Sequence, residues 1–150
     1  MRTRLVAAVL VTSALAATAA QAQGSRELAA LGLATWSAFE CSTLAAQTKN
    51  AMEQERLFLY GYRQGQTFIE AVRAGKIDRK DLSSEVPMGV MLLLEGPTVD
   101  FILGRIYENA QENALKDVLT TEQRLNPDEV QTMLAQGKFR RANCGLIGSK

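Results

Sequence analysis

Histidine is absent from this sequence and cysteine occurs only twice, so the side chains on which most catalytic and metal sites depend are missing. Zinc sites, Ser-His-Asp triads and Cys-His pairs all use these residues as ligands, bases or nucleophiles. We therefore expect a protein that is not an enzyme, with no catalytic residue, no metal site and no cofactor.

An excess of charge of either sign is also missing. Seventeen Lys and Arg residues face 16 Asp and Glu residues, which leaves a formal net charge of +1. This balance excludes a strongly basic nucleic-acid binder and an acidic solvating chain. With 47% apolar and 22% charged residues and no low-complexity linker, the 150 residues have the composition of one ordinary globular domain.

The beginning of the chain has the pattern of a secretory signal peptide. Arg2 and Arg4 form a cationic head, residues 5–20 are rich in Ala, Val and Leu, and Ala20-Gln21-Ala22 places small side chains where a signal peptidase reads. A membrane anchor is the alternative interpretation. Residues 5–20 are, however, shorter and less apolar than the roughly 20 residues that span a bilayer.

We therefore predict a signal peptide over residues 1–22, cleaved after Ala22, and a single helical domain over residues 23–150. The mature protein is expected in the periplasm or outside the cell, without stable insertion in a membrane.

Export determines how Cys41 and Cys144 are interpreted. In an oxidising compartment a lone pair of cysteines forms a disulfide by default. In the chain-entropy model, a disulfide that closes a loop of roughly 100 residues stabilises a fold by about 4.7 kcal/mol. The net stability of a small domain is of similar size, roughly 5 to 15 kcal/mol. A redox-active pair is the alternative, but such cysteines usually lie two residues apart near the start of a helix.

Hydrophobic spacing predicts an all-α domain of about four to six helices. Three helices are indicated most strongly, at residues 52–74 and 97–119 and from Asn126 onward. Gly75 suits a left-handed C-terminal cap of the first helix. Pro97 suits the first turn of the second. Asn126 and Pro127 suit the N-cap and first turn of the third, with Val130, Met133, Leu134 and Phe139 facing inward.

Shorter helices are expected at residues 27–33, 36–46 and 78–84, with Gly32 weakening the expectation that the first two are continuous. Met88–Leu94 is the most apolar stretch after the leader. At that length, periodicity does not separate a buried helix from a buried strand, so both stay open. Alternating strand patterns appear nowhere else.

Gly61 and Gly65 lie one turn apart on the apolar face of the helix predicted at 52–74. Each costs about 1 kcal/mol relative to alanine in a helix interior, so something must approach that face closely. We expect the helix that carries Gly104, Ala110 and Ala114 to do so. The alternative is a groove that receives a segment of a partner.

Tyr60, Tyr62 and Arg63 surround Gly61 and are residue types that dominate interface energetics. Helical geometry places the two tyrosines about 200° apart, so we expect one in the core and the other at the surface. Together with Gly61 and Gly65, these residues are our candidates for partner binding or for close helix packing.

Asp100 and Arg105 interrupt an apolar stretch. Their spacing of five is too offset for pairing with each other, so we expect partly buried ion pairs with Glu55, Arg56 or Glu70. Glu108 and Glu112 could share one helix face. Because no further ligand pattern accompanies them, we expect a solvated face rather than acid-base or metal chemistry.

Residues 36–45 include Phe39-Glu40-Cys41-Ser42-Thr43-Leu44-Ala45, which resembles the aromatic-x-Cys-x-x-apolar opening of small helical periplasmic acid-stress chaperones. Those proteins are exported, all-helical and closed by one disulfide. Their second cysteine follows at a much shorter separation, so no site residue is carried over. The leader, the helices and the single disulfide are also similar to the periplasmic immunity proteins that neutralise wall-degrading effectors of rival bacteria.

Together these features predict an exported, non-enzymatic protein that binds another protein as an inhibitor or immunity-like protein, either as a monomer or as a homodimer. A periplasmic acid-stress chaperone is the alternative. Protonating the carboxylates at low pH would leave a strongly positive chain, whose self-repulsion would loosen the fold and expose the region around Leu92.

Overall fold

The computed structural model of the chain describes the backbone of residues 7–149 and the side chains of residues 24–149. The predicted signal peptide and its cleavage point lie outside the part whose side chains are described. The helices are α1 Ala7–Gln47, α2 Ala51–Arg73, α3 Arg79–Glu85, α4 Met88–Met91, α5 Val99–Leu115 and α6 Asp128–Arg141. A hairpin of β1 Thr120–Thr121 and β2 Arg124–Leu125 and a 3-10 helix, η1 Cys144–Leu146, complete the described elements.

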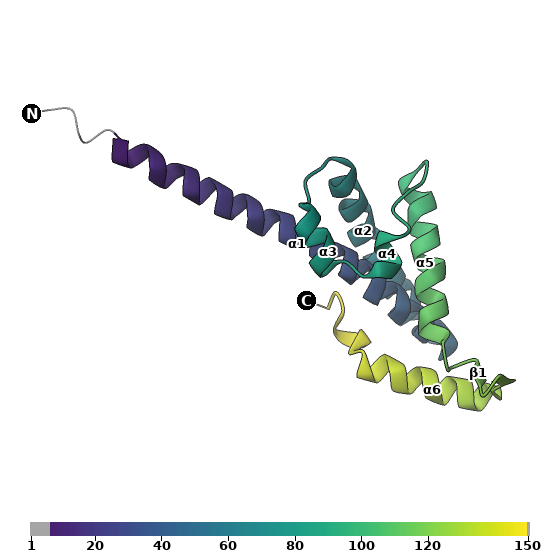
Figure 1. The fold of residues 1–150 in the computed structure, drawn as a ribbon. Coiled ribbons are helices and arrows are strands. Elements are labelled where there is room, and N and C mark those ends of the chain that lie inside the picture. The colour runs from purple at the N-terminus through teal and green to yellow at the C-terminus, as the bar shows by residue number, and fades with distance from the viewer. Residues whose placement is uncertain (1–6, 150) are drawn as a thin grey trace, which may run out of the picture.

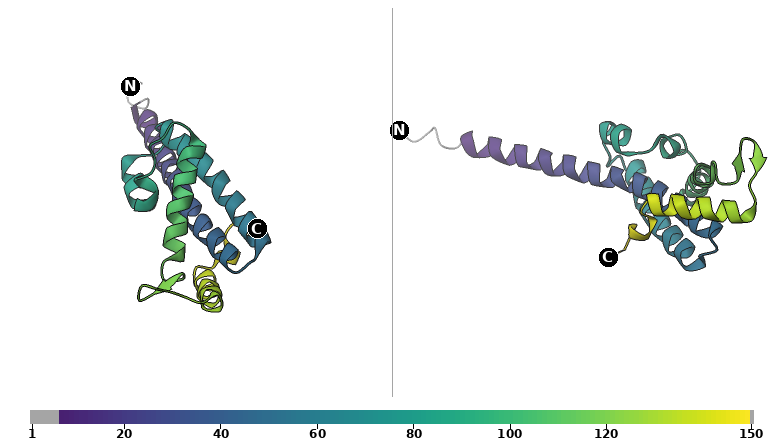
Figure 2. Two further views of the ribbon diagram at one scale, coloured as in Figure 1. Left: turned by 90° about the vertical axis from the view of Figure 1, so that its right-hand side faces the viewer. Right: turned by 90° about the horizontal axis from the view of Figure 1, so that it is seen from below.

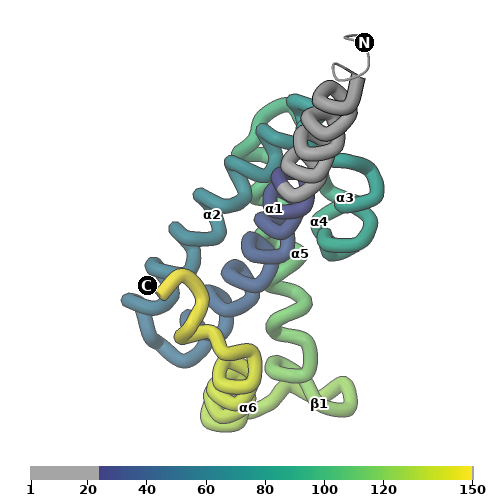
Figure 3. Tube along the Cα trace, turned by 90° about the vertical axis from the view of Figure 1, so that its left-hand side faces the viewer, coloured from purple at the N-terminus to yellow at the C-terminus, as the bar shows by residue number. Residues whose placement is uncertain are grey.

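Helix α1 is the centre of the fold, because α2, α3, α5, α6 and η1 all contact it (Figure 1). Helices α2 and α5 lie on either side of α1, and α6 crosses the end at which α5 terminates (Figure 3). The C-terminal residues then return past α1 and α2 (Figure 2). The prediction of an all-α fold closed by the Cys41–Cys144 disulfide is confirmed.

The two segments expected at residues 27–33 and 36–46 are parts of the single helix α1. Gly32 does not break it, because this glycine packs against the core: an added Cβ would lie 3.1 Å from side-chain atoms of both Phe68 and Val86. Residues Gly24–Gln47 are long and apolar enough to cross a membrane, but more than half of the most apolar part of this segment is buried inside the protein. Packing between α2 and α5 therefore accounts for its apolar character.

The core has two parts. The larger one gathers around Phe39, Phe68, Ile102 and Ile106 where α1, α2 and α5 meet. The smaller one surrounds the disulfide and includes Leu44, Leu57, Val118 and Ala135. The second part joins α6 and η1 to the helices that precede them.

The predicted helix at 52–74 is confirmed as α2, and Gly75 has the expected left-handed conformation with φ +64°. Helix α5 begins later than predicted because Thr98 is its cap, accepting a hydrogen bond from the Phe101 N–H at 3.1 Å. It ends at Leu115 instead of Leu119, and the chain turns there with Asp117 at φ 62°.

Asn126 does not cap α6 with its side chain, which corrects the sequence prediction. The buried Asn126 Nδ2 donates instead to the carbonyl of Val118 at 2.8 Å, and Pro127 takes the N-cap position. Met133, expected to face inward, is 61% exposed, because α6 turns Gln131 and Ala135 toward the core.

Met88–Leu94 is a single helical turn, α4, followed by a bend, and it is not a uniformly buried segment. Val90 is buried, but Met88 is 63% and Leu92 is 72% exposed. One short turn can cover only one side, so the other apolar side chains stay in solvent. The β1–β2 hairpin was not predicted, since its turn uses Glu122 and Gln123 at positive φ in place of the usual Asn-Gly.

Candidate functional site

A group of aromatic rings lies between α2 and α5 at the surface of the protein. Phe58 of α2 stacks on Tyr62, with ring centroids 6.2 Å apart, and meets Tyr107 of α5 edge-on at 5.4 Å. The buried Phe39 of α1 lies beneath, 5.8 Å from Phe58 and 5.2 Å from Tyr107. Phe58 remains 36% exposed, so the group is fixed from below and open to solvent.

Asp100 and Gly104 extend this group along α5. The Tyr62 hydroxyl donates to Asp100 Oδ1 at 2.6 Å, and this hydrogen bond raises the pKa of Tyr62. Gly104 follows one turn later and is exposed. We call Phe58, Tyr62, Asp100, Gly104 and Tyr107 the α2/α5 aromatic face.

Within the described part of the chain, no close contact explains why position 104 is a glycine. A Cβ added there would find no atom within 4 Å. A glycine in the middle of a helix costs about 1 kcal/mol relative to alanine. At this position the cost is not offset by close contact with another helix.

Gly61 and Gly65 do show the close approach that their spacing predicts, but the neighbour is mainly α1. A Cβ at Gly61 would lie 2.9 Å from Phe39 and 3.1 Å from Ala38. A Cβ at Gly65 would lie 2.4 Å from Leu103 of α5 and 3.0 Å from Thr35 of α1. Because α1 fills this side of α2, no groove for a partner segment is formed there. Gly104 itself does not approach Gly61 or Gly65.

The tyrosines and Arg63 do not form one cluster. Tyr60 and Tyr62 are both half-buried, so the expected division into a core and a surface tyrosine is wrong. Tyr62 faces α5, whereas the Tyr60 ring packs against Gly148 near the C terminus. Arg63 is exposed. The structure therefore leaves Tyr62 as the candidate residue on the aromatic face.

The ion pairs predicted for Asp100 and Arg105 are not present. Arg105 Nη1 donates to the Glu95 carbonyl at 2.8 Å, and its guanidinium lies 5.8 Å above the Phe101 ring. Asp100 has the neutral Tyr62 as its hydrogen-bond donor. The expected partner Arg56 is held elsewhere on α2.

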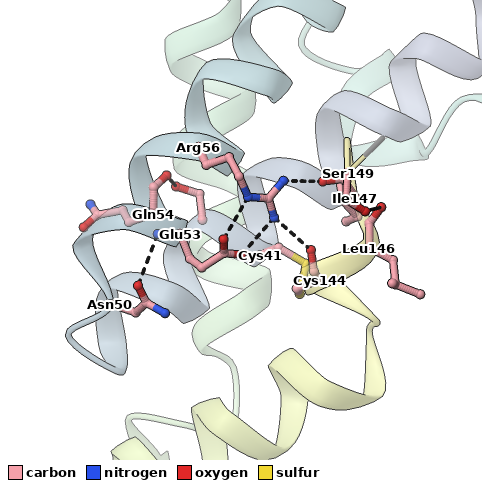
Figure 4. Close-up of polar contacts among 10 residues, drawn as sticks. Cys41, Asn50, Glu53, Gln54, Arg56, Cys144, Leu146, Ile147 and Ser149 are labelled. Carbon is pink, nitrogen blue, oxygen red and sulfur yellow. Dashed lines mark hydrogen bonds and ion pairs between the residues drawn. A yellow bond between two sulfur atoms is a disulfide. The ribbon is translucent and has the colours of Figure 1, made fainter.

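Arg56 fastens the C-terminal segment beside the disulfide (Figure 4). Its Nε and Nη2 both bond the Glu53 carboxylate at 2.8 Å, while Nη1 donates to the Ile147 carbonyl at 2.5 Å. The bonded guanidinium lowers the pKa of Glu53. Cys41 and Cys144 are both buried, with Cα atoms 5.5 Å apart. This arrangement, which we call the C-terminal clamp, ties α2 to the end of the chain.

The pKa of Glu40 is shifted in the opposite direction from that of Glu53. Burial raises its pKa, although hydrogen bonds from Asn113 and Trp36 partly compensate. A raised pKa in the folded state favours folding at low pH and opposes it as pH rises through that value. Nearby, Lys138 Nζ donates to the Ala114 carbonyl at 3.0 Å and to that of Lys116, and so caps the end of α5.

Glu108 and Glu112 are both exposed on α5, as expected of a solvated face. Within the described residues, no group of three or more His, Cys, Asp or Glu side chains could hold a metal ion. The α2/α5 aromatic face offers a ligand three features: aromatic surface, the carboxylate of Asp100, and the uncovered helix backbone at Gly104.

Comparison with protein families, with curated proteins and with solved structures finds no match for this chain. The resemblances to acid-stress chaperones and to immunity proteins therefore stay predictions. The chain has a helical fold, a Cys41–Cys144 disulfide as formed in oxidising compartments, and an N-terminal apolar helix compatible with a signal sequence.

Proposed function

We propose that this chain is an exported, non-enzymatic protein that binds another protein through the α2/α5 aromatic face, in the manner of an inhibitor or immunity protein. The observation that carries the proposal is Gly104, a helix-interior glycine whose uncovered side lies beside partly exposed aromatic rings. A partner that approaches the α5 backbone closely would supply the packing that this glycine lacks.

The aromatic face has other properties of a binding site. Aromatic residues are enriched at the energetic centres of interfaces, because they bring large contact area at a small loss of side-chain entropy. Phe58 and Tyr107 contact each other and Phe39, which restrains them before a partner arrives. A rigid surface of this kind suits an inhibitor, since little order has to be gained on binding.

A substitution at Gly104 tests the proposal without disturbing the fold. The mature protein, residues 23–150, is immobilised and exposed to the envelope fraction of the cells that produce it and, separately, to the secreted proteins of competing bacteria. Gly104→Trp is expected to reduce the amount of its captured partner at least tenfold, because the indole occupies the position that the partner must approach. Thermal unfolding should show that the variant is at least as stable as the wild type, since the new Cβ meets no atom within 4 Å and the helix loses an unfavourable glycine.

Gly145→Trp is the matched control, because Gly145 also has nothing within 4 Å of an added Cβ and lies in η1, outside the aromatic face. It should capture the same partner as the wild type, and that partner should lose its activity on binding. Equal capture by wild type and Gly104→Trp, or no protein recovered above the level of Gly104→Trp, would contradict the proposal.

The acid-stress chaperone is a second candidate, favoured by the C-terminal clamp. Because the pKa of Glu53 is lowered from 4.5 in the folded state, its stabilising contribution is present above pH 4.5 and is lost as pH falls through the folded value. Protonated Glu53 would release Arg56, and with it the segment that covers Tyr60. Exposure of Leu92 needs no acid, since this side chain is already in solvent.

If protonation of Glu53 opens the C-terminal clamp, the clamp should already be open at pH 7 in Glu53→Gln, as it is in the wild type at low pH. A hydrophobic dye should then bind the wild type only at a pH below 4.5 and bind Glu53→Gln already at neutral pH. Glu55→Gln, an exposed neighbour on the same helix, is the control and should behave as the wild type. A wild type that stays compact and does not bind the dye down to pH 2 contradicts the chaperone candidate.

A further inference from the structure

The α2/α5 aromatic face presents a carboxylate that no cation of the described chain neutralises. The ion pairs among the described residues are Arg26–Glu85 and Arg56–Glu53, and neither lies on this face. Tyr62 donates to Oδ1 of Asp100, and no described residue donates to Oδ2. Asp100 is exposed, so a ligand from solution can reach the remaining oxygen.

The charged residues that lie one helical turn from the face on α2 and α5 are acidic. Glu55 precedes Phe58 by one turn, Glu108 follows Gly104 by one turn, and both are exposed. Arg105 follows Gly104 directly and is turned about 100° away from it on α5, where it stacks over Phe101 and donates to the Glu95 carbonyl. Arg63 follows Tyr62 directly on α2 and is therefore turned about 100° away from it. The face thus complements a positive charge.

Building on the proposed function, we propose that the α2/α5 aromatic face binds an arginine side chain of the partner protein. The guanidinium lies over Gly104, between the rings of Tyr62 and Tyr107, and pairs with Asp100.

Each part of the face matches one property of this group. A guanidinium stacks on aromatic rings and donates in its plane to a carboxylate, which an ammonium does less well. The missing side chain at Gly104 leaves space one turn from Asp100 for a flat group to lie against the helix. Tyr62, fixed by its hydrogen bond, holds both its ring and the Asp100 carboxylate in position.

Binding is tested on the mature protein with two small probes, N-acetyl-arginine amide and N-acetyl-citrulline amide, which have the same shape but differ in charge. Backbone amide shifts in NMR spectra detect site-specific binding even at millimolar dissociation constants. Arginine amide is expected to shift the signals of Asp100, Gly104 and Tyr107 in a saturable manner, and citrulline amide is expected to bind at least tenfold more weakly.

Asp100→Asn removes the charge but keeps an oxygen that can accept the Tyr62 hydrogen bond. It should weaken arginine amide binding about tenfold, whereas Glu112→Gln, an exposed charge farther along α5, should leave binding unchanged. The inference is overturned if arginine amide shifts none of these signals, if citrulline amide binds equally well, or if Asp100→Asn binds as the wild type does.

Failure of this inference can be told apart from failure of the proposed function. If Gly104→Trp loses the captured partner but arginine amide does not bind the face, the surface binds a protein through other chemistry. If arginine amide binds but Gly104→Trp captures the partner as well as the wild type does, the arginine site is real and the proposed function is wrong.

Discussion

Replacing both cysteines with alanine, Cys41→Ala with Cys144→Ala, is expected to lower the free energy of unfolding by about 4.7 kcal/mol. The crosslink spans 103 residues and joins α1 to η1, so its loss frees most of the domain in the unfolded state. This loss is close to the lower limit of the net stability of whole domains, which is about 5 to 15 kcal/mol. Urea unfolding followed by circular dichroism measures it.

The wild type in reductant provides the matched comparison, since its side-chain volumes are unchanged. Its unfolding midpoint should fall toward that of the double variant, and the double variant should not respond to reductant. Unfolding midpoints of the wild type that agree with and without reductant would show that the disulfide is absent from the purified protein. In that event the interpretation of an oxidising compartment also fails, because it depends on this bond.

Phe39→Ala is expected to cost about 3 to 5 kcal/mol, which is the range for a large side chain removed from a core. Phe39 is 1% exposed and contacts Phe58 and Tyr107, both of which lose a supporting ring. The cavity would form directly beneath the α2/α5 aromatic face. The variant should therefore lose affinity for the partner as well as stability, as thermal unfolding and capture can measure.

A second substitution, at Gly61, shows whether this loss arises from the predicted contact. In the wild type, Gly61→Ala should destabilise by about 1 to 3 kcal/mol, because the new methyl group would overpack the site 2.9 Å from Phe39 and 3.1 Å from Ala38. In the Phe39→Ala background the same change should cost at least about 1 kcal/mol less than in the wild type, since the Phe39 ring is removed and only the contact with Ala38 remains. Additive effects of the two substitutions would contradict the packing described for α1 and α2.

The elements that were predicted well are those whose cause lies within a few residues of the sequence. The spacing of apolar residues and Gly75 define α2 almost to the residue, because periodicity and the left-handed cap are both local properties. Cys41 and Cys144 allow a single pairing, so the covalent connection was fixed once export was inferred. The cost of Gly61 and Gly65 correctly indicated a close approach to α2.

What approaches those glycines was decided by tertiary packing. The sequence favoured the helix of Gly104, and Leu103 of that helix does approach Gly65, but Phe39, Ala38 and Thr35 of α1 supply the other close contacts. Asn126 illustrates the same limit, since its buried bond to Val118 replaces the cap that its local sequence suggests. Met88 and Leu92 are exposed because α4 is too short to turn them inward.

The candidate site could not be read from the sequence for the same physical reason. Phe58, Tyr62 and Tyr107 come from two helices that are far apart in the chain, and only their shared packing on Phe39 brings the rings together. The sequence by itself determined the helical class, the single possible disulfide and the absence of histidine. The tertiary structure decided which side of each helix stays open to a partner, because that depends on which surfaces the other helices have already covered.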